Sequence, residues 1–238
     1  MDISPRAILG SSPPRLEDLR PSHGEVHFLW FFIQGSIMVP DTRARLRRAW
    51  GMCQRHSFTF LAVDAAFHHG YLHGPALLYE DLMGRALAAF NLYGPLQEIR
   101  VAYRLRNTGP CLMCELGYSS TSYGMASREM FEQGRDLTEI RAFAETTSFY
   151  WRKIVCGCCA QDETRPRCRV HLREELILGT AKLREHRTLV QYITEHMGRY
   201  TRSFRWECRD TDTMEDRAAL IGAVGWCSGW QPWLSLIG

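Results

Sequence analysis

The sequence predicts an all-α fold, and three observations support this prediction. Apolar residues recur at helical spacing along several long segments, and residues that favour helix starts precede many of them. No segment shows the repeated alternation of apolar and polar residues that is typical of half-buried strands, and no glycine-rich phosphate loop occurs. With 238 residues, 45% of them hydrophobic, the chain can bury a substantial core.

The first part of the chain is expected to contain three helices after a proline-rich arm, residues 1–22. The apolar segment Val26–Val39 predicts a buried helix that ends at Pro40. Asp41 is a suitable N-cap for the next helix, because its carboxylate can accept from the free N–H groups of the first turn. Pro75 favours the start of a third helix, since proline is preferred in the first helical turn.

The second part of the chain is expected to contain five helices. They are predicted from apolar spacing in some segments and from capping, turn or breaking residues in others. The predicted segments are residues 96–107, Cys111 to about Gln133, Asp136 to about Val155, His171 to about His196, and a short last helix that is capped near Asp212 or Thr213.

These segments suggest a helical bundle with two pseudo-repeated halves, residues 23–95 and 96–238, which could also form one compact domain. Each half has a long helix, a second capped helix, a Cys-x2-His pair and then an apolar helix. The two Cys-x2-His pairs occupy equivalent places in this scheme. We therefore predict related halves, with a zinc-knuckle-like clip in the second.

Two pairs of candidate metal ligands stand far apart in the second half. They are Cys111-x2-Cys114 and Cys168-x2-His171. A two-residue gap lets one short turn direct both side chains at one ion, and three thiols with one imidazole are a typical ligand set for structural zinc. The sequence therefore predicts one closed Cys3His zinc site from these four residues.

Other cysteines leave alternatives open. Cys53-x2-His56 could be half of a second site, whose partners would have to come from His23, His27, His68, His69 or Glu80. Cys156, Cys158 and Cys159 form a cysteine-rich turn before Cys168. One of these three could replace His171, or the thiols together could hold an iron–sulfur cluster, which takes four thiolates. A reactive Cys158–Cys159 pair is a further alternative.

The composition and charge of the chain argue against a secreted protein or a membrane protein and give little support to a nucleic-acid-binding protein. The first residues do not resemble a signal peptide, and the longest apolar run falls short of the roughly 20 residues that span a bilayer. We therefore expect a cytoplasmic protein without a membrane segment, in which nine cysteines serve metal or redox chemistry rather than disulfides. A net charge of +3 is too small to predict nucleic-acid binding by itself.

The motifs also resemble a family. An uncharacterised group of bacterial helical proteins carries a CPxC motif near a helix start and later a segment of the type GFCxxH. The segments RLRRAWGMCQRHSFTFLAVD, GPCLMCELG and RCRVHLREELI are similar to parts of that family. Leu112 stands in place of the usual proline, and the first half lacks a CPxC motif. The resemblance implies a helical fold and metal ligands at Cys111, Cys114, Cys168 and His171, but no activity.

Three classes of function follow from these observations. The first is a zinc-binding helical scaffold or interaction protein, with a protein partner or a second copy of the chain. The second is a metal-dependent enzyme, or an iron–sulfur or thiol redox enzyme. The third is a nucleic-acid-binding regulator, which the arginines of segments 43–48 and 165–169 would serve.

Overall fold

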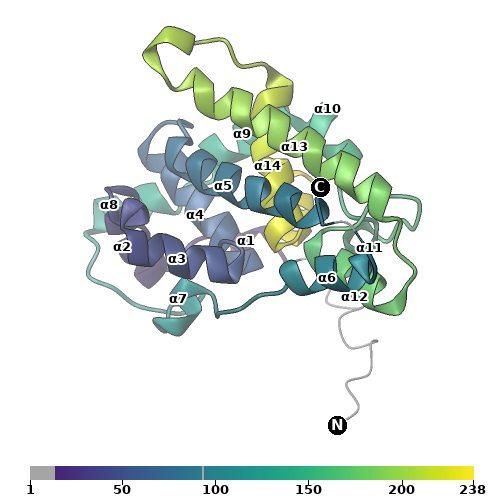
Figure 1. Cartoon of the computed structure of the whole chain (residues 1–238). Coiled ribbons are helices and arrows are strands. Elements are labelled where there is room, and N and C mark those ends of the chain that lie inside the picture. Colours follow the sequence, from purple (N-terminus) through teal and green to yellow (C-terminus); the bar gives the residue numbers. More distant parts are fainter. Residues whose placement is uncertain (1–13, 93) are drawn as a thin grey trace.

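A computed structural model describes residues 14–92 and 94–238, and within these ranges it contains helices and connecting segments without a β-strand (Figure 1). The all-α prediction is therefore confirmed. The elements are α1 (Leu16–Leu19), α2 (His23–Ile33), η2 (Ser36–Met38), α3 (Pro40–Ala49), α4 (Gln54–Phe67), α5 (His73–Phe90), α6 (Gln97–Arg104), α7 (Leu112–Glu115), α8 (Arg128–Gly134), α9 (Thr138–Thr146), α10 (Ser148–Trp151), η3 (Arg152–Ile154), α11 (Gly157–Ala160), α12 (Arg169–Leu178), α13 (Leu183–Ser203), η4 (Trp206–Cys208), α14 (Met214–Ser228) and α15 (Gln231–Ile237).

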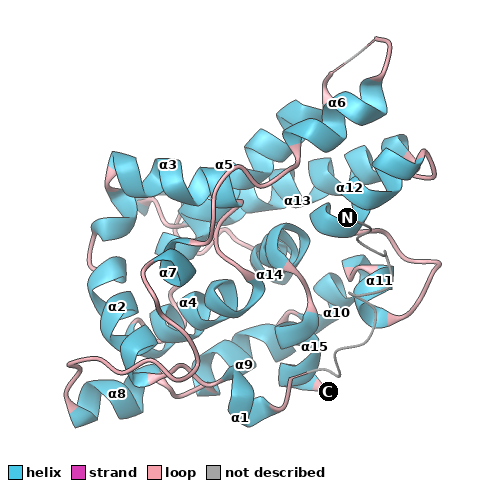
Figure 2. Ribbon diagram, turned by 90° about the horizontal axis from the view of Figure 1, so that it is seen from below, coloured by secondary structure: helices cyan, strands magenta, loops and turns pink. Residues whose placement is uncertain are grey.

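Helix α14 is the central element of the bundle (Figure 2). Its residues from Ala218 to Cys227 are all buried, as expected for a helix that is apolar on every face. Two glycines let neighbours approach its backbone closely. A Cβ at Gly222 would lie 2.7 Å from Ile154 Cδ1, and one at Gly225 would lie 2.5 Å from the Trp230 ring. Thr213 caps this helix, as the sequence predicts.

The two predicted halves of the chain share this core. The long helix α13 lies along α5, and both pack against α14 (Figure 1). Helix α4 packs against α2, α9 and α15. Helices from both sides of residue 95 therefore contact each other directly in the core. Among the described residues, no helix is both long enough and apolar enough to cross a membrane.

The helix predicted from Cys111 to Gln133 is wrong. Helix α7 ends after Glu115, because Gly117 takes a positive φ of 82° that stops the helix. The chain then runs without helical structure until Ser127, whose side chain caps α8. In this segment Ser122 accepts a hydrogen bond from the backbone N–H of Gly24, at the start of α2.

Two other predicted helices are each divided. The segment from Asp136 to Val155 breaks after α9, where the Thr147 hydroxyl donates to the carbonyl of Phe143 at 2.7 Å. The segment from His171 to His196 breaks at Gly179, which adopts the left-handed conformation at the end of α12.

Helix starts in the first part also differ from the prediction. Helix α2 ends at Ile33, and the rest of the predicted Val26–Val39 helix contains the short η2. Pro40 begins α3 instead of ending the previous helix, so Val39 is the N-cap and Asp41 lies in the first turn.

Candidate metal centres

Four short turns present a Cys-x2-Cys or Cys-x2-His pair in the same local geometry. In each turn the first residue is the N-cap of a helix with extended backbone angles, and the second lies at the third helical position. These two positions project side chains toward the same side of the helix start, where free N–H groups also favour thiolates. The turns are Cys53–His56 before α4, Cys111–Cys114 before α7, Cys156–Cys159 before α11 and Cys168–His171 before α12.

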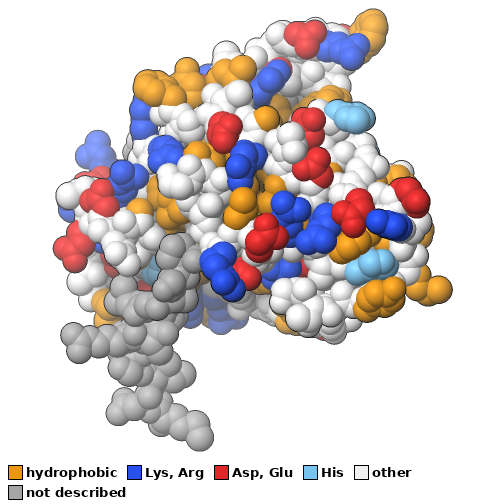
Figure 3. All heavy atoms as spheres, turned by 180° about the vertical axis from the view of Figure 1, so that it is seen from behind, with side chains coloured by type: hydrophobic (Ala, Val, Ile, Leu, Met, Phe, Trp, Pro, Cys, Tyr) orange, Lys and Arg blue, Asp and Glu red, His pale blue; other side chains and the backbone are white. Residues whose placement is uncertain are grey.

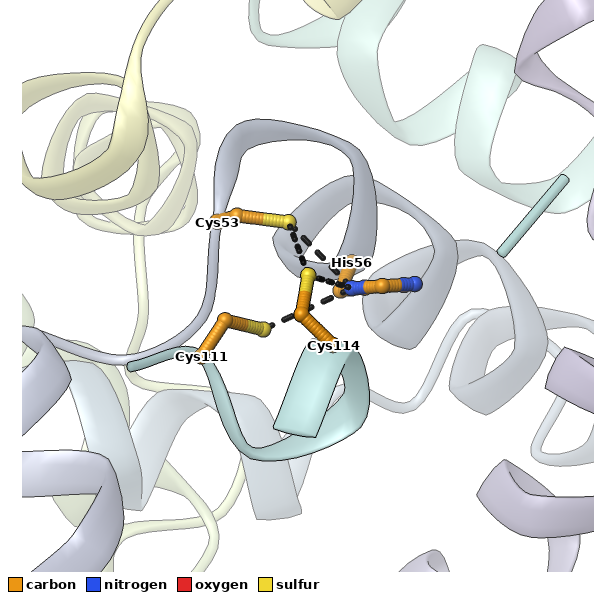
Figure 4. A group of neighbouring side chains, drawn as sticks. All are labelled: Cys53, His56, Cys111 and Cys114. Carbon is orange, nitrogen blue, oxygen red and sulfur yellow. Dashed lines mark hydrogen bonds between the residues drawn. The ribbon is translucent and has the colours of Figure 1, made fainter. Parts of the chain in front are cut away.

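The structure joins these turns two by two. Group 1 contains Cys53, His56, Cys111 and Cys114, and their side chains converge between α4 and α7 (Figure 4). Group 2 is formed between α11 and α12. It contains Cys156, Cys159, Cys168 and His171. In each group the four possible ligand atoms all lie within 4.8 Å of one another.

The ligand atoms of group 1 have the spacing of a tetrahedral metal shell. His56 Nδ1 lies 3.2 Å from Cys53 Sγ, 3.4 Å from Cys111 Sγ and 3.3 Å from Cys114 Sγ. The sulfurs of Cys53 and Cys114 are 3.7 Å apart. Around a zinc ion, ligand pairs would be separated by about 3.5 Å for N and S and about 3.8 Å for two sulfurs. One ring nitrogen carries one hydrogen or one lone pair, so hydrogen bonding cannot account for three thiols around it.

The imidazole of group 1 is held from behind by a buried carboxylate. Glu25 of α2 is fully buried, and its Oε1 lies 3.2 Å from His56 Nε2. Arg55 contacts both oxygens of Glu25 at 2.7 Å, and the backbone N–H of Ser22 donates to Oε2. A carboxylate at Nε2 favours a proton there, which leaves Nδ1 free to bind a metal.

Group 2 repeats this spacing in a more buried setting. His171 Nδ1 lies 3.3 Å from both Cys156 Sγ and Cys168 Sγ, and 3.7 Å from Cys159 Sγ. Cys156 and Cys168 are 1% and 2% exposed, so two of the three sulfurs are shielded from solvent. The whole group is encoded by one continuous pattern, Cys-x2-Cys-x8-Cys-x2-His.

The turn of group 2 is closed by backbone hydrogen bonds at Gly157. Its N–H donates to the carbonyl of Pro166, and its carbonyl accepts from the N–H of Asp162. A Cβ at Gly157 would lie 2.0 Å from the carbonyl oxygen of Asp162, so only glycine fits. Ion pairs between Arg165 and Asp162 and between Arg167 and Glu175 hold the sides of this turn.

Replacing Gly157 with alanine is expected to open this turn and weaken metal binding by group 2. The added methyl group must displace backbone, so we expect a loss of about 2–4 kcal/mol of stability. Gly84 is a matched control, because it is exposed on α5 with open space around its Cβ position. Alanine there should stabilise the chain by about 0.5–1 kcal/mol. Denaturant melts of both variants measure the difference, and equal effects would contradict the role assigned to Gly157.

The charges within each group depend on one another. A hydrogen bond from the Cys53 thiol and the neighbouring His56 lower the pKa of Cys111 to about 3, against the effect of burial. Burial disfavours the His56 imidazolium, but the Cys111 thiolate and Glu25 outweigh it and raise the pKa of His56 to about 9. In group 2, contacts with Cys156 and Cys159 raise the pKa of His171 to about 10. Further thiolates raise one another's pKa by repulsion, which a divalent cation would relieve.

The four residues predicted to form one site do not converge. Cys111 and Cys114 lie in group 1, whereas Cys168 and His171 lie in group 2, and α7 and α12 are apart in two perpendicular views (Figures 1 and 2). Each predicted pair is half of a different group. The predicted clip between these pairs is therefore corrected to two separate Cys3His groups.

The residues set aside as alternatives complete both groups. Cys53 and His56 take Cys111 and Cys114 as partners, instead of the histidines or Glu80 considered from the sequence. Cys156 and Cys159 join group 2. Cys158 belongs to neither group, and burial raises the pKa of its thiol to about 11. Of the adjacent pair Cys158–Cys159, only Cys159 is therefore a candidate metal ligand.

The arginines of the two basic segments are largely engaged within the chain. Arg43 and Arg47 pair with Asp81, and Arg45 pairs with Glu115. Arg169 is buried and donates to the carbonyls of Cys227 and Leu105, while its guanidinium lies 5.3 Å from the Trp50 ring. Figure 3 shows Lys and Arg interspersed with Asp and Glu on one face. These contacts give the nucleic-acid hypothesis no support.

Group 1 is the part of the site that sequence reasoning described least well. Its buried partner Glu25 could be recognised from the sequence only as the end of a Ser-x2-Glu capping box. Comparison of the chain with protein-family models, curated proteins and solved structures finds no match. The resemblance to the CPxC family stays a prediction, and the chain is described by its two Cys3His groups.

Proposed function

We propose that this protein is a helical scaffold that holds two structural zinc ions, one in each Cys3His group. The observation that carries the proposal is the convergence of three sulfurs on one imidazole nitrogen, at 3.2–3.4 Å in group 1. The same arrangement recurs in group 2 at 3.3–3.7 Å. Packing alone would not place four unrelated donor atoms at such spacing twice.

The donor set favours zinc over other metals. Thiolate and imidazole ligands in a tetrahedral set suit Zn²⁺, whereas Ca²⁺ and Mg²⁺ require oxygen ligands. An iron–sulfur cluster binds its protein ligands to different iron atoms, so the ligands would stand farther apart than donors to a single ion. Mutual separations within 4.8 Å therefore fit one ion better than a cluster.

Each ion would fasten a four-residue helix, α7 or α11, to the start of a longer one. In group 1 it would join the start of α4 to the short α7 and, through Glu25, to α2. In group 2 it would join the cysteine-rich turn to the start of α12. Four protein ligands leave no open position for water or substrate, so the metal would serve structure rather than catalysis. Structural metal sites of this kind are consistent with a scaffold or interaction protein.

Elemental analysis of the purified chain tests this proposal. We expect two zinc ions per chain, one in Cys111→Ser, one in Cys168→Ser and none in the double variant. Cys208→Ser is the control and should keep both ions, because Cys208 lies outside both groups. A cobalt-substituted chain should show the absorption of a tetrahedral, sulfur-rich site.

Two outcomes would contradict the proposal. Absence of zinc from the wild-type chain would remove its basis. A brown chain that contains iron and sulfide would instead support a cluster.

A further inference from the structure

The two groups differ in how far their sulfurs are open to solvent. In group 1 Cys114 is exposed and Cys53 is half-buried. In group 2 Cys156 and Cys168 are buried, and Cys159 is half-buried. A solute that attacks thiolates therefore has a direct approach to group 1 through Cys114.

The surroundings of Cys114 also bring a second sulfur close to it. Cys114 lies on α7, a four-residue helix with a non-helical segment on each side. The sulfur of Cys53 is 3.7 Å away and faces it in Figure 4. An oxidised Cys114 would thus have a second thiolate within reach, which is the arrangement that forms a disulfide.

We propose that Cys114 is an oxidation site for hydrogen peroxide, and that its disulfide with Cys53 releases the metal of group 1 while group 2 keeps its ion. This inference rests on the proposed function, because it names a regulation of the same zinc sites. It goes further by assigning the two groups different roles: group 1 responds to peroxide and group 2 is permanent.

The chemistry requires only the peroxide and the two thiolates. The Cys114 thiolate attacks one peroxide oxygen, so a sulfur–oxygen bond forms, the oxygen–oxygen bond breaks, and hydroxide leaves. The Cys53 thiolate then attacks the Cys114 sulfur. A sulfur–sulfur bond forms, and the second oxygen leaves as hydroxide. Two protons convert both hydroxides to water, so two thiolates lose two electrons and one peroxide gains them.

Loss of the ion follows from the change in ligands. A disulfide sulfur is a much poorer ligand than a thiolate, so group 1 would keep only His56 and Cys111 as strong donors. Two donors do not hold zinc as four do. In group 2 the burial of Cys156 and Cys168 limits access to the sulfurs, and Cys159 lies in a turn closed around Gly157.

The test treats the zinc-loaded full chain with a few equivalents of hydrogen peroxide and measures released zinc with a chromogenic chelator. We expect one of the two ions to be released and the other to stay. Peptide mass mapping should then find a Cys53–Cys114 disulfide. With limiting peroxide, a sulfenic-acid trap should label Cys114 before any other group 1 or group 2 cysteine.

Two variants sharpen the test. Cys114→His keeps a metal ligand at the third helical position, where His56 and His171 already serve, but removes the exposed thiol. Its zinc content is measured before treatment, and its group 1 ion should then be released roughly tenfold more slowly under peroxide than that of the wild-type chain. Cys158→Ser, which removes a thiol outside both groups, should behave as wild type.

The outcomes separate this inference from the proposed function. Two zinc ions before treatment, followed by no release or by equal release from both groups, would overturn the inference and leave the proposed function intact. Rapid release from Cys114→His would also overturn it, because oxidation would then begin elsewhere. A chain purified without zinc would contradict both. Release of one ion with a mapped Cys53–Cys114 disulfide would support the inference.

Discussion

Replacing Cys168 with serine is expected to lower the melting temperature of the chain by roughly 10–20 °C. Cys168 is 2% exposed and contributes one of three sulfurs to group 2. Structural zinc contributes on the order of 10 kcal/mol to the folding of small zinc modules, which is comparable to the whole stability of a typical domain. Losing even half of that contribution would remove much of the free energy of unfolding of the chain. Thermal melts followed by circular dichroism measure the change.

Cys158→Ser is the matched control for this prediction. It makes the same chemical change ten residues earlier, at a half-buried thiol outside group 2. Its melting temperature should stay close to wild type, with a change of about 0.5 kcal/mol or less. Addition of a strong chelator should lower the melting temperature of the wild-type chain at least as much as Cys168→Ser does, because the chelator removes the ions of both groups. If both serine variants melted alike and the chelator had no effect, group 2 would not hold a stabilising ion.

Replacing Glu25 with alanine is expected to weaken the zinc affinity of group 1 by about 10–100-fold. The carboxylate orients the His56 ring from behind and is itself held by Arg55. Its removal leaves His56 without its buried partner and Arg55 without its counter-charge. We also expect the free energy of unfolding to fall by about 3 kcal/mol. Competition with a chromogenic chelator measures the affinity, and denaturant melts measure stability.

Asp216→Ala separates these two effects. Asp216 is also a buried carboxylate at the third position of a capped helix, and its Oδ1 lies 2.7 Å from Nδ1 of His196. That histidine belongs to neither metal group. The two variants should therefore lose similar stability, but only Glu25→Ala should lose zinc affinity. Equal zinc binding by the two variants would refute the metal-orienting role of Glu25.

The sequence predicted the class of fold and the approximate positions of most helices, but not their exact starts or lengths. Apolar spacing located α5, because a buried face must repeat at the helical period, and a capping residue located α14. The predicted helix beyond Cys111 failed because Gly117 stops α7, and the serines that follow bind the backbone of another helix instead of continuing this one. Such contacts depend on residues nearly a hundred positions away.

The candidate ligands were found from the sequence, whereas their pairing was not. A two-residue spacing identifies half of a site, and only the packing of α4 against its neighbours decides that Cys53 meets Cys114. Group 2 is different, because Cys156-x2-Cys159 and Cys168-x2-His171 stand close together in the sequence. The intervening Cys158 obscured this spacing. Reading each cysteine pair by its own gap would have revealed group 2 without a structure.

The lengths of chain that the two groups enclose have a consequence for metal loading. Group 2 closes a loop from Cys156 to His171, whereas group 1 must bring together Cys53 and Cys114, which enclose a loop about four times longer. Loop closure alone makes group 1 less favourable by about 1.2 kcal/mol in an unfolded chain. When zinc is scarce, nascent or refolding molecules should therefore fill group 2 first. A short peptide of that region should chelate an ion by itself, whereas group 1 should bind its ion only after the bundle has assembled.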